Sequence, residues 1–562
     1  MLSSWGENVE CDCLMIDANC MLHPCAHSVL RDADVNEPEA SLHTRIYHAT
    51  CEYIDHVASI VRPRALLYIA VDGPAPRAKM NTQRHRRYKS AKTHRLSAMA
   101  SAKLNLPRRS FDTNAMTPGT KFMQGLDAYM RDYFYRRTKV AGIEIVFSGS
   151  SVAGEGEHKI MAYIRACRSP DIRFCVYGLD ADLIFLSLSA QRAGMALVRE
   201  RVYFRKGADN SVAGRDMRDV EFDRLDIDRL KDAFAADVAR RTGATYDTDK
   251  LVRDFVMYAY FLGNDFLHAV PGISTHMDGL DVLLQAYLKT LRTQTIHLVK
   301  ADGTFNSMFL QAFIAELASS EDANLEREAN ARRFRAAQDV RRDAAMTQAE
   351  HQHASLMSAF ENVQGRQQDT IHAGKAGWRQ RYWIQLFGLD PSNGDEWETY
   401  RRRVVANYLE GLKWTHQYYT GNTQNWHWHY MYEHSPCLSD IAEFYTDINT
   451  INLPKTKPWR PLEQLMMVLP PESRALLPQS YADAMVGVKI GHMYPDDFAV
   501  HAASKRFYGE CTPNLPVLEA GEVLETTKTL KLSAVDKALN RLEKGDVRVR
   551  AGGADGGDDQ QA

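Results

Sequence analysis

Residues Phe147–Leu188 read FSGSSVAGEGEHKIMAYIRACRSPDIRFCVYGLDADLIFLSL and contain two pairs of acids, each of which follows a short apolar run. The first pair follows the run 143–147 across a glycine-rich turn, and the second follows the run 174–178. After the first pair, apolar residues recur at helical spacing. We therefore predict the first pair where a strand leads into a helix, and the second where a strand leaves its sheet. The four acids are Glu155, Glu157, Asp180 and Asp182.

Two further apolar runs also end in an acid. The run CLMID ends in Asp17, and LLYIAVDG carries Asp72 near its end. In an open α/β sheet, the functional crevice lies at the carboxyl ends of the strands. A single acid at a strand end is most simply a turn residue or a helix cap, but acids at four strand ends favour a common site. The pattern predicts six acids on one rim of one sheet.

A cluster of six carboxylates requires cations. Two like charges about 4 Å apart repel by roughly 4 kcal/mol at an effective dielectric constant of ~20. Oxygen ligands without clustered His or Cys partners favour Mg²⁺ or Mn²⁺ over Zn²⁺. Two such ions can stabilise the attacking and the leaving oxygen of a phosphodiester. The acids thus indicate a two-metal site for phosphodiester hydrolysis.

The composition is that of an ordinary globular protein. The 562 residues are 45% hydrophobic and 25% charged, and this length indicates two or more domains. The formal net charge of −2 excludes a protein that coats itself with nucleic acid through bulk charge. No apolar run is long enough to predict a membrane span, and the start MLSSWGENVE lacks the basic and apolar segments of a secretory signal.

The nine cysteines show no disulfide framework, which indicates free thiols in a reducing compartment. Cys11 and Cys13 alternate in the first predicted strand and are expected in the core. A zinc site is the alternative for a second group, but its spacing matches no standard zinc pattern. That group is Cys20, His23, Cys25 and His27.

A basic segment follows Asp72 directly. Pro74 and Pro76 disfavour helix at its start, and we expect a helix from about Arg77 onward. A basic helix is by default a solvated one, but a row of cations beside a metal site would hold a phosphate at a fixed distance from the metals. We favour a phosphate-binding face at positions i, i+4, i+7 and i+8. These residues are Lys79, Gln83, Arg86 and Arg87.

Several segments resemble the signatures of the Xrn-type 5′→3′ exoribonucleases. In the first half they are VDGPAPRAKMNTQRHRRY (71–88), NAMTPGTKFM (114–123), FSGSSVAGEGEHKIM (147–161), VYGLDADLIFLSL (176–188) and FLGNDFL (261–267). In the second half, YLEGLKWTHQYYTG (408–421), NWHWHYMYEHSPCLSDI (425–441) and PLEQLMMVLPPESRALLP (461–478) resemble the family's second conserved region. The resemblance runs from about residue 12 to about residue 515. It implies a PIN- and flap-nuclease-like α/β fold: a mostly parallel sheet with helices on both faces, and a mainly helical second region packed against it.

The resemblance also implies roles for individual residues. The helical face described above would form the pocket for the 5′ phosphate. His23, in the expected loop Ala18–Pro24, would stack on the first base, and Asn19 would contact the substrate beside the first acid. Asp265, in FLGND at the end of a predicted helix, adds a seventh acid that the strand-end argument does not supply. The implied metal centre is Asp17, Asp72, Glu155, Glu157, Asp180, Asp182 and Asp265.

A tryptophan of the second region would stack on the other side of the first base. The segment NWHWHY offers Trp426 and Trp428, and the spacing does not choose between them. Stacking tolerates every base and is worth ~1–3 kcal/mol per base. Core packing is the alternative for both, and for Trp414 core packing is the better interpretation.

We expect the chain to divide into four parts. These are a nuclease domain (1–300), a charged helical or flexible linker (301–375), the second conserved region (376–531), and a C-terminal helix with a disordered tail (532–562). Residues 316–368 hold few large apolar side chains, so we expect exposed helix or partly disordered chain there. Within the final part, Leu532–Arg548 reads as a charged amphipathic helix.

The chain also departs from the family that it resembles. An N-terminal segment and the C-terminal accessory domains are expected to be absent, and the helical excursion after the basic motif shortens to about Ser90–Arg109. Such a minimal form fits a virus or a reduced lineage. We expect an intracellular protein, cytoplasmic rather than nuclear, because the basic run Arg84–Arg87 is assigned to phosphate binding.

The predicted activity is hydrolysis of single-stranded RNA from a 5′-monophosphate end to nucleoside 5′-monophosphates, in RNA decay and mRNA decay in particular. Two Mg²⁺ or Mn²⁺ ions would serve as cofactors, and no membrane partner is expected. A flap-type endonuclease is one alternative, although flap enzymes have no counterpart of the second region. A non-catalytic RNA-binding protein on the same fold is another, and the intact set of acids disfavours it.

Overall fold

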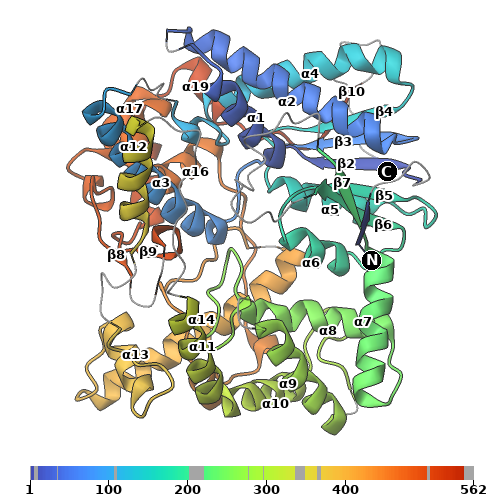
Figure 1. Ribbon diagram of the computed structural model, residues 1–562, viewed down its shortest axis with the longest axis vertical. Helices are drawn as coiled ribbons and strands as arrows, with labels where there is room; N and C mark the ends of the chain where they lie inside the picture. Colours follow the sequence, from blue (N-terminus) through green and yellow to red (C-terminus); the bar gives the residue numbers. More distant parts are fainter. Residues whose placement is uncertain are drawn as a thin grey trace.

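The computed structural model describes residues 2–4, 10–34, 36–106, 111–201, 220–275, 278–294, 296–335, 348–363, 369–423, 425–502, 505 and 507–549. One large sheet lies on one side of the molecule, and helices occupy the remainder (Figure 1). In the described part of the chain, no helix is both long and apolar enough to span a membrane.

The large sheet has eight strands in the order β1-β7-β6-β5-β2-β3-β4-β10. Its five central strands run parallel: β6 (Met195–Glu200), β5 (Phe174–Tyr177), β2 (Cys13–Asp17), β3 (Leu66–Ala70) and β4 (Glu144–Ser148). At the edges, antiparallel pairing adds β1 (Leu2–Ser4), β7 (Phe222–Asp226) and β10 (Val547–Val549). The mostly parallel sheet is therefore confirmed.

The strand order reverses between β2 and β5. The chain passes from β2 through β3 to β4 at one side, and then returns to form β5 on the other side of β2. In open α/β sheets, ligands bind outside the carboxyl ends of the strands at such a reversal. Asp17 is the last residue of β2, and Asp180 follows β5 by three residues.

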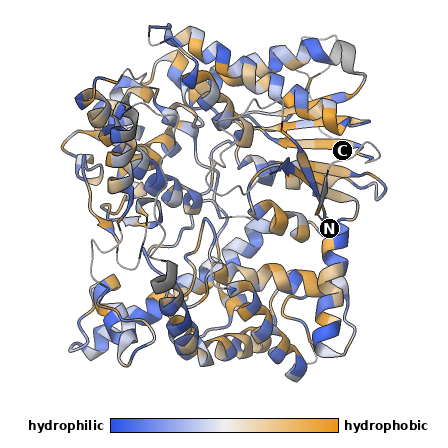
Figure 2. Ribbon diagram, in the orientation of Figure 1, coloured by the Kyte–Doolittle hydropathy of each residue, from blue (hydrophilic) through white to orange (hydrophobic). Residues whose placement is uncertain are grey.

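Successive strand residues point to opposite faces of the sheet, and helices cover both faces because both are apolar. Leu14 and Ile69 belong to one core, and Met15 and Tyr68 belong to another. Figure 2 shows the central strands as largely hydrophobic. The first core is closed by α1 (Asn19–Arg31), α2 (Glu39–Val61) and α4 (Lys121–Ala141), and the second by α5 (Gly156–Ala166) and α6 (Asp182–Ser189).

The second core continues into a layer of helices that mixes both halves of the sequence (Figure 1). Trp414 is fully buried in this layer, as expected. From the first half come α7 (Ile227–Thr242), α8 (Thr248–Ala259), α9 (Gly279–Thr293) and α10 (Ser307–Ser319). From the second half come α14 (Gly394–Tyr419) and α15 (Leu438–Glu443). The second region thus packs directly against the first.

Helix α3 (Arg77–Lys103) leaves the sheet after β3 and begins where the sequence predicts. It is mainly hydrophilic (Figure 2), yet Met80 lies in a third core with the last part of the second region. The elements that pack against α3 or contribute to this third core are α12 (Gln348–Glu361), α16 (Pro461–Val468), α17 (Gln479–Met485), α18 (Ala520–Lys528) and the small sheet of β8 (Val500–His501) and β9 (Thr512–Pro513).

The expected loop Ala18–Pro24 is wrong, because α1 begins at Asn19 and contains Pro24. Proline lacks an N–H group, so the helix forgoes one backbone hydrogen bond. In exchange, α1 packs along α2 and buries four side chains. These are Met21, Leu22, Cys25 and Ala26.

The expectation for residues 316–368 is also wrong in part. Leu317 and Glu321 are fully buried, and Leu325 of α11 (Glu321–Arg335) is nearly so. The carboxylate of Glu321 accepts a hydrogen bond from the backbone N–H of Leu438 and forms an ion pair with Arg379. A buried polar residue thus anchors this segment to the core. Residues 336–347 and 364–368 of the expected linker lie outside the described residues. The four-part division of the chain stays a prediction.

The C-terminal part is not one amphipathic helix. A short helix, α19 (Ala534–Leu539), is followed by β10, which pairs with β4 at the edge of the large sheet. Strand pairing prevails because Val549 is buried in the core beneath α4, which a surface helix would not achieve. The tail from residue 550 onward lies outside the described residues.

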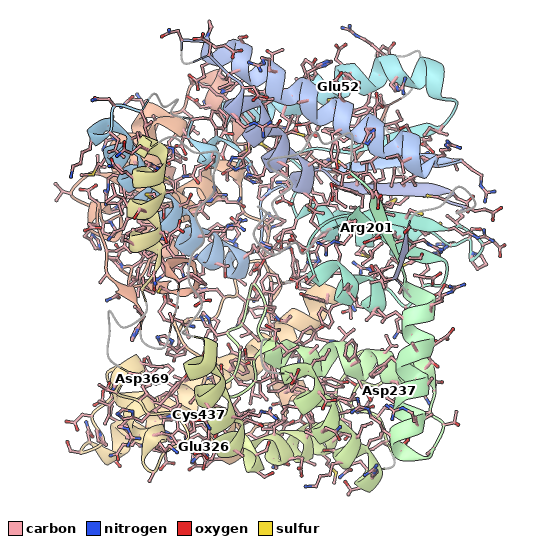
Figure 3. The ribbon with its side chains drawn as sticks, viewed as in Figure 1. Glu52, Arg201, Asp237, Glu326, Asp369 and Cys437 are labelled. Atoms are coloured by element: carbon pink, nitrogen blue, oxygen red, sulfur yellow. The ribbon has the colours of Figure 1, made fainter. Side chains whose placement is uncertain are left out.

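All nine cysteines are free thiols. Cys11 and Cys13 are buried, as expected. Cys437 lies among the helices beside α13 (Trp378–Phe387), well away from Arg201 at the strands (Figure 3).

Candidate active site

The acids at the strand ends come together at the carboxyl rim of four neighbouring parallel strands. The acids are close enough to affect one another's ionisation. Desolvation and then the charges of Asp72 and Asp180 raise the pKa of Asp17, and desolvation and then the charge of Asp265 raise the pKa of Asp182. Asp17 ends β2 and Asp72 follows β3 by two residues, whereas Asp265 follows the short 3-10 helix Tyr260–Leu262. The remaining four acids flank the starts of α5 and α6; they are Glu155, Glu157, Asp180 and Asp182.

Backbone hydrogen bonds join the strand ends to one another. The side-chain oxygen of Asn19 accepts the N–H of Asp72 at 2.8 Å, and the N–H of Gly156 donates to Asp72 Oδ1 at 2.7 Å. The N–H of Asn19 donates to Asp17 Oδ1 at 3.2 Å. Asn19, implied as a substrate contact, is therefore engaged in holding two acids in register.

Two glycines permit this close approach. A Cβ on Gly156 would lie 2.8 Å from Asp17 Oδ1, inside any real contact distance. Gly154 has φ of +110°, a conformation that L side chains rarely adopt. The glycine-rich turn that opens the acid motif is thus required by geometry.

Burial makes three of the acids costly to ionise. Asp17, Glu155 and Glu157 are each less than a tenth exposed. Desolvation and then the charge of Asp72 raise the pKa of Asp17 to about 7, and desolvation raises the pKa of Glu157 well above its ordinary value. Glu157 Oε2 is buried without a hydrogen-bond partner in the described part of the chain. An all-oxygen donor set with an unpartnered buried carboxylate fits a divalent cation.

Lys79 reaches into the acids instead of standing apart from them. Its ammonium forms ion pairs with Glu155 and with Asp265. Desolvation opposes the charge on Lys79, but the neighbouring acids outweigh it and raise the pKa of the amine well above its ordinary value. Desolvation likewise acts against ionised Asp265, but Lys79 holds the pKa of that carboxyl below its usual range.

Among the described residues, no three His, Cys, Asp or Glu side chains form a ready ligand group for one ion.

The other residues of the predicted phosphate face lie beside the acids. Arg87 donates to Asn114 Oδ1 at 2.8 Å, which ties α3 to the NAMTPGT segment. Gln83 is buried, and its Oε1 and the Nε of Arg87 have no hydrogen-bond partner among the residues that the structure describes. Arg86 is exposed. The face therefore offers polar groups that the protein itself does not use.

His23 stands next to this basic face. Its side chain is exposed on α1, and desolvation followed by the charges of Arg86 and Arg87 lowers its pKa to about 4. The imidazole is accordingly neutral at physiological pH. A neutral ring beside a basic face is suited to stack on a base.

The two candidate tryptophans differ in their surroundings. Trp428 is 8% exposed, stacks on Trp414 with ring centroids 5.2 Å apart, and donates to Glu410 at 3.2 Å. Trp426 is only partly buried, and its carbonyl accepts the N–H of Arg77 at the start of α3. Trp428 is thus a packing residue here, and of the two only Trp426 keeps exposed surface beside α3.

Sequence reasoning missed two tyrosines at the end of α14. The hydroxyl of Tyr418 donates to Glu155 Oε1 at 2.7 Å. Desolvation and then the charge of Asp182 raise the pKa of Tyr419 well above its ordinary value, so this phenol lies near a second acid. The segment YYTG contributed to the family resemblance without a predicted role for either tyrosine. The only available signal was two adjacent phenols, which does not identify their partners.

Lys159 is a further buried group of this region. Its ammonium donates to the carbonyls of Val71 and Gly149, each at 2.8 Å. It therefore links the residues that follow β3 and β4, and its role is to hold the rim together.

Comparison with known proteins agrees with this geometry. Residues 3–201 match the family described as "XRN 5'-3' exonuclease N-terminus", and residues 245–366 and 328–551 match "Xrn1 helical domain". The chain is 27% identical to "5'-3' exoribonuclease 2" of Arabidopsis thaliana, over 95% of this chain and 64% of that protein. It is 28% identical to "5'-3' exoribonuclease 1" of Schizosaccharomyces pombe (95% and 47%) and of Homo sapiens (92% and 32%). The chain thus spans less than two thirds of the length of these relatives.

Proposed function

The chain belongs to the XRN 5′-3′ exonuclease family, and on this premise we propose that it is itself a 5′→3′ exoribonuclease. It would hydrolyse single-stranded RNA from a 5′-monophosphate end and release nucleoside 5′-monophosphates. The observation that carries the proposal is the meeting of acids, basic helix face and His23 at the strand-order reversal of the sheet. The nine free thiols favour a reducing compartment, and we assign the activity to cytoplasmic RNA decay, including that of mRNA.

We assign the seven acids to a centre for two Mg²⁺ or Mn²⁺ ions. The raised pKa of Asp17 and the unpartnered oxygen of Glu157 support this assignment, because a cation would compensate both. When bound, such ions activate water and stabilise the leaving oxygen. The acids are Asp17, Asp72, Glu155, Glu157, Asp180, Asp182 and Asp265.

The basic face of α3 would bind the 5′ phosphate. Arg86 and Arg87 can donate to its oxygens, and so can the Nε2 of Gln83, whereas the unpartnered Oε1 of Gln83 is an acceptor and must face a donor instead. Lys79 would stand between this phosphate and the acids, since it is paired with two of them. A 5′ hydroxyl would lose the charge pairing, and a cap or triphosphate would be rejected by its size.

The first base would lie against His23. Trp426 is the tryptophan that we assign to its other side, because Trp428 would have to leave its stack on Trp414. Both rings would act without reading the base, so every nucleotide could be accepted in turn.

A direct test uses 3′-labelled single-stranded RNA that carries a 5′ monophosphate, triphosphate or hydroxyl. The products are sized over time with Mg²⁺ and then with EDTA. We expect mononucleotide release from the monophosphate substrate alone, and no release with EDTA. Internal cuts independent of the 5′ group would indicate a flap-type endonuclease, and binding without any cleavage would indicate a non-catalytic RNA-binding protein.

The variant Asp180→Ala sharpens the test. Asp180 is exposed, so its replacement should leave folding intact, while the loss of one metal ligand should lower the rate by at least about 10²-fold. Asp171→Ala is the matched control, because Asp171 is an exposed acid that precedes β5 instead of following it. Unchanged turnover of Asp180→Ala would refute the site assignment.

A further inference from the structure

We propose that Tyr418, the residue before the last of α14, is a positioning residue that holds Glu155 ready for divalent cations. The inference rests on the function proposed above, which assigns Glu155 to the metal centre. It means that the helical second region completes the catalytic rim of the sheet, with a phenol for an acid that follows β4.

Tyr418 and Lys79 together hold both oxygens of Glu155. The phenol of Tyr418 donates to Oε1 at 2.7 Å, and the ammonium of Lys79 pairs with Oε2. Tyr418 and Glu155 are each 4% exposed, so water does not compete for this hydrogen bond. Desolvation and then the charge of Glu155 raise the pKa of Tyr418 well above its ordinary value, so the phenol keeps the proton that it donates.

The backbone of the next residue, Tyr419, is fixed. Its carbonyl accepts hydrogen bonds from Ser189 Oγ at 2.9 Å and from Arg165 Nη1 at 3.3 Å. Arg165 belongs to α5 and Ser189 to α6, the helices at whose starts the acids lie. The end of α14 is thus fastened to the same two helices that carry the acids.

Aromatic packing sets the direction of the Tyr418 hydroxyl. Its ring stacks on His158 with centroids 3.7 Å apart and on Trp414 at 5.0 Å, and Trp414 stacks in turn on Trp428 at 5.2 Å. Phe266 meets the ring edge-on at 5.3 Å. His158 follows Glu157 and Phe266 follows Asp265 in the chain, so the neighbours of two further acids enclose this ring.

A carboxylate held in one orientation binds a metal ion at lower cost than a carboxylate that must be reoriented. Groups that hydrogen-bond to metal ligands typically contribute 10–100-fold to metal affinity or activity. Removal of the Tyr418 hydroxyl should therefore weaken cation binding even though the phenol is not itself a ligand of the cation.

The test compares Tyr418→Phe with Tyr260→Phe. Phenylalanine keeps the ring stack and removes only the hydroxyl. Tyr260 is the control because its buried hydroxyl has no hydrogen-bond partner among the described residues, although its ring contacts Tyr419 at 5.3 Å. Mn²⁺ binding to RNA-free protein is measured by electron paramagnetic resonance, and the Mg²⁺ concentration for half-maximal RNA degradation is measured separately.

We expect the Kd for Mn²⁺ to rise about tenfold or more in Tyr418→Phe, and to stay at the wild-type value in Tyr260→Phe. The Mg²⁺ requirement should rise in parallel. A purely structural role would lower the unfolding midpoint without moving the Kd, and that result would overturn the inference. Wild-type protein that binds no Mn²⁺ would overturn the metal centre itself, whereas normal wild-type binding with unchanged binding by Tyr418→Phe would overturn only the positioning role.

Discussion

Both faces of α3 carry basic side chains, but the groups that these side chains contact differ between the two faces. One face is directed to the acids and to His23, and we propose that it binds the 5′ phosphate; it consists of Lys79, Gln83, Arg86 and Arg87. The other donates to backbone carbonyls between residues 493 and 518; it includes Arg77, Arg84, Lys89, Lys92 and Arg95.

The difference shows that a run of basic residues does not by itself indicate a function, because the function depends on the groups that the side chains contact. A guanidinium that donates to buried carbonyls replaces hydrogen bonds that the chain cannot make with itself, so it stabilises the fold. The Nε atoms of Arg77, Arg84 and Arg87 all lack a hydrogen-bond partner among the described residues, so the two faces differ instead in their terminal nitrogens, which donate to backbone carbonyls in Arg77 and Arg84 and to the Asn114 side chain in Arg87. Three substitutions test this division, in order of decreasing effect.

Arg84→Met should have the largest effect, and the effect should be on stability. Arg84 is 5% exposed and donates to the carbonyls of Pro516 at 2.9 Å and Met493 at 2.6 Å. Hydrogen bonds from charged groups contribute about 1.5–3 kcal/mol each, so the free energy of unfolding should fall by about 3 kcal/mol or more. Urea unfolding measures this change. The preference for a 5′ monophosphate over a 5′ hydroxyl should persist, and its loss in a stable variant would reverse the assignment of the two faces.

Arg87→Ala should act on substrate choice. The lost charge-assisted hydrogen bond to phosphate is worth about 1.5–3 kcal/mol, which corresponds to a roughly 10–100-fold fall in kcat/KM for 5′-monophosphate RNA relative to 5′-hydroxyl RNA. Arg87→Lys is the control, because it keeps the charge without the guanidinium fork and should lose only part of the preference. An intact preference in Arg87→Ala would place the pocket elsewhere.

Lys92→Ala should have the smallest effect. Lys92 donates to the carbonyl of Phe498 at 2.8 Å and pairs with Asp497, whose side chain is 69% exposed. Exposed ion pairs contribute about 0–1 kcal/mol and one hydrogen bond from a charged group about 1.5–3 kcal/mol, so the free energy of unfolding should fall by about half as much as in Arg84→Met, while RNA degradation should remain close to wild type. Weakened RNA binding by Lys92→Ala would mean that RNA also follows the carbonyl-bound face.

Much of the rim was predictable because it depends on local rules. Apolar runs of strand length ending in Asp17, Asp72 and the paired acids identify parallel strands, and their carboxyl ends must share one edge. The start of α3 at Arg77 follows from the two prolines before it. The loop expected at Ala18–Pro24 was wrong because the burial of apolar residues of α1 stabilises a helix there despite the single proline.

The sequence alone therefore determined the four strands that lead to the acids, the acids on their rim and the helix that carries the proposed phosphate-binding face, since each depends on the period of a strand or a helix. Only the tertiary structure decided which bases stabilise the fold, that Trp428 stacks on Trp414, and that Tyr418 reaches Glu155 from 263 residues away. Periodicity records which side of an element a residue occupies. It carries no information about which distant element is packed there, because that choice is made by the summed burial and hydrogen bonding of the whole fold.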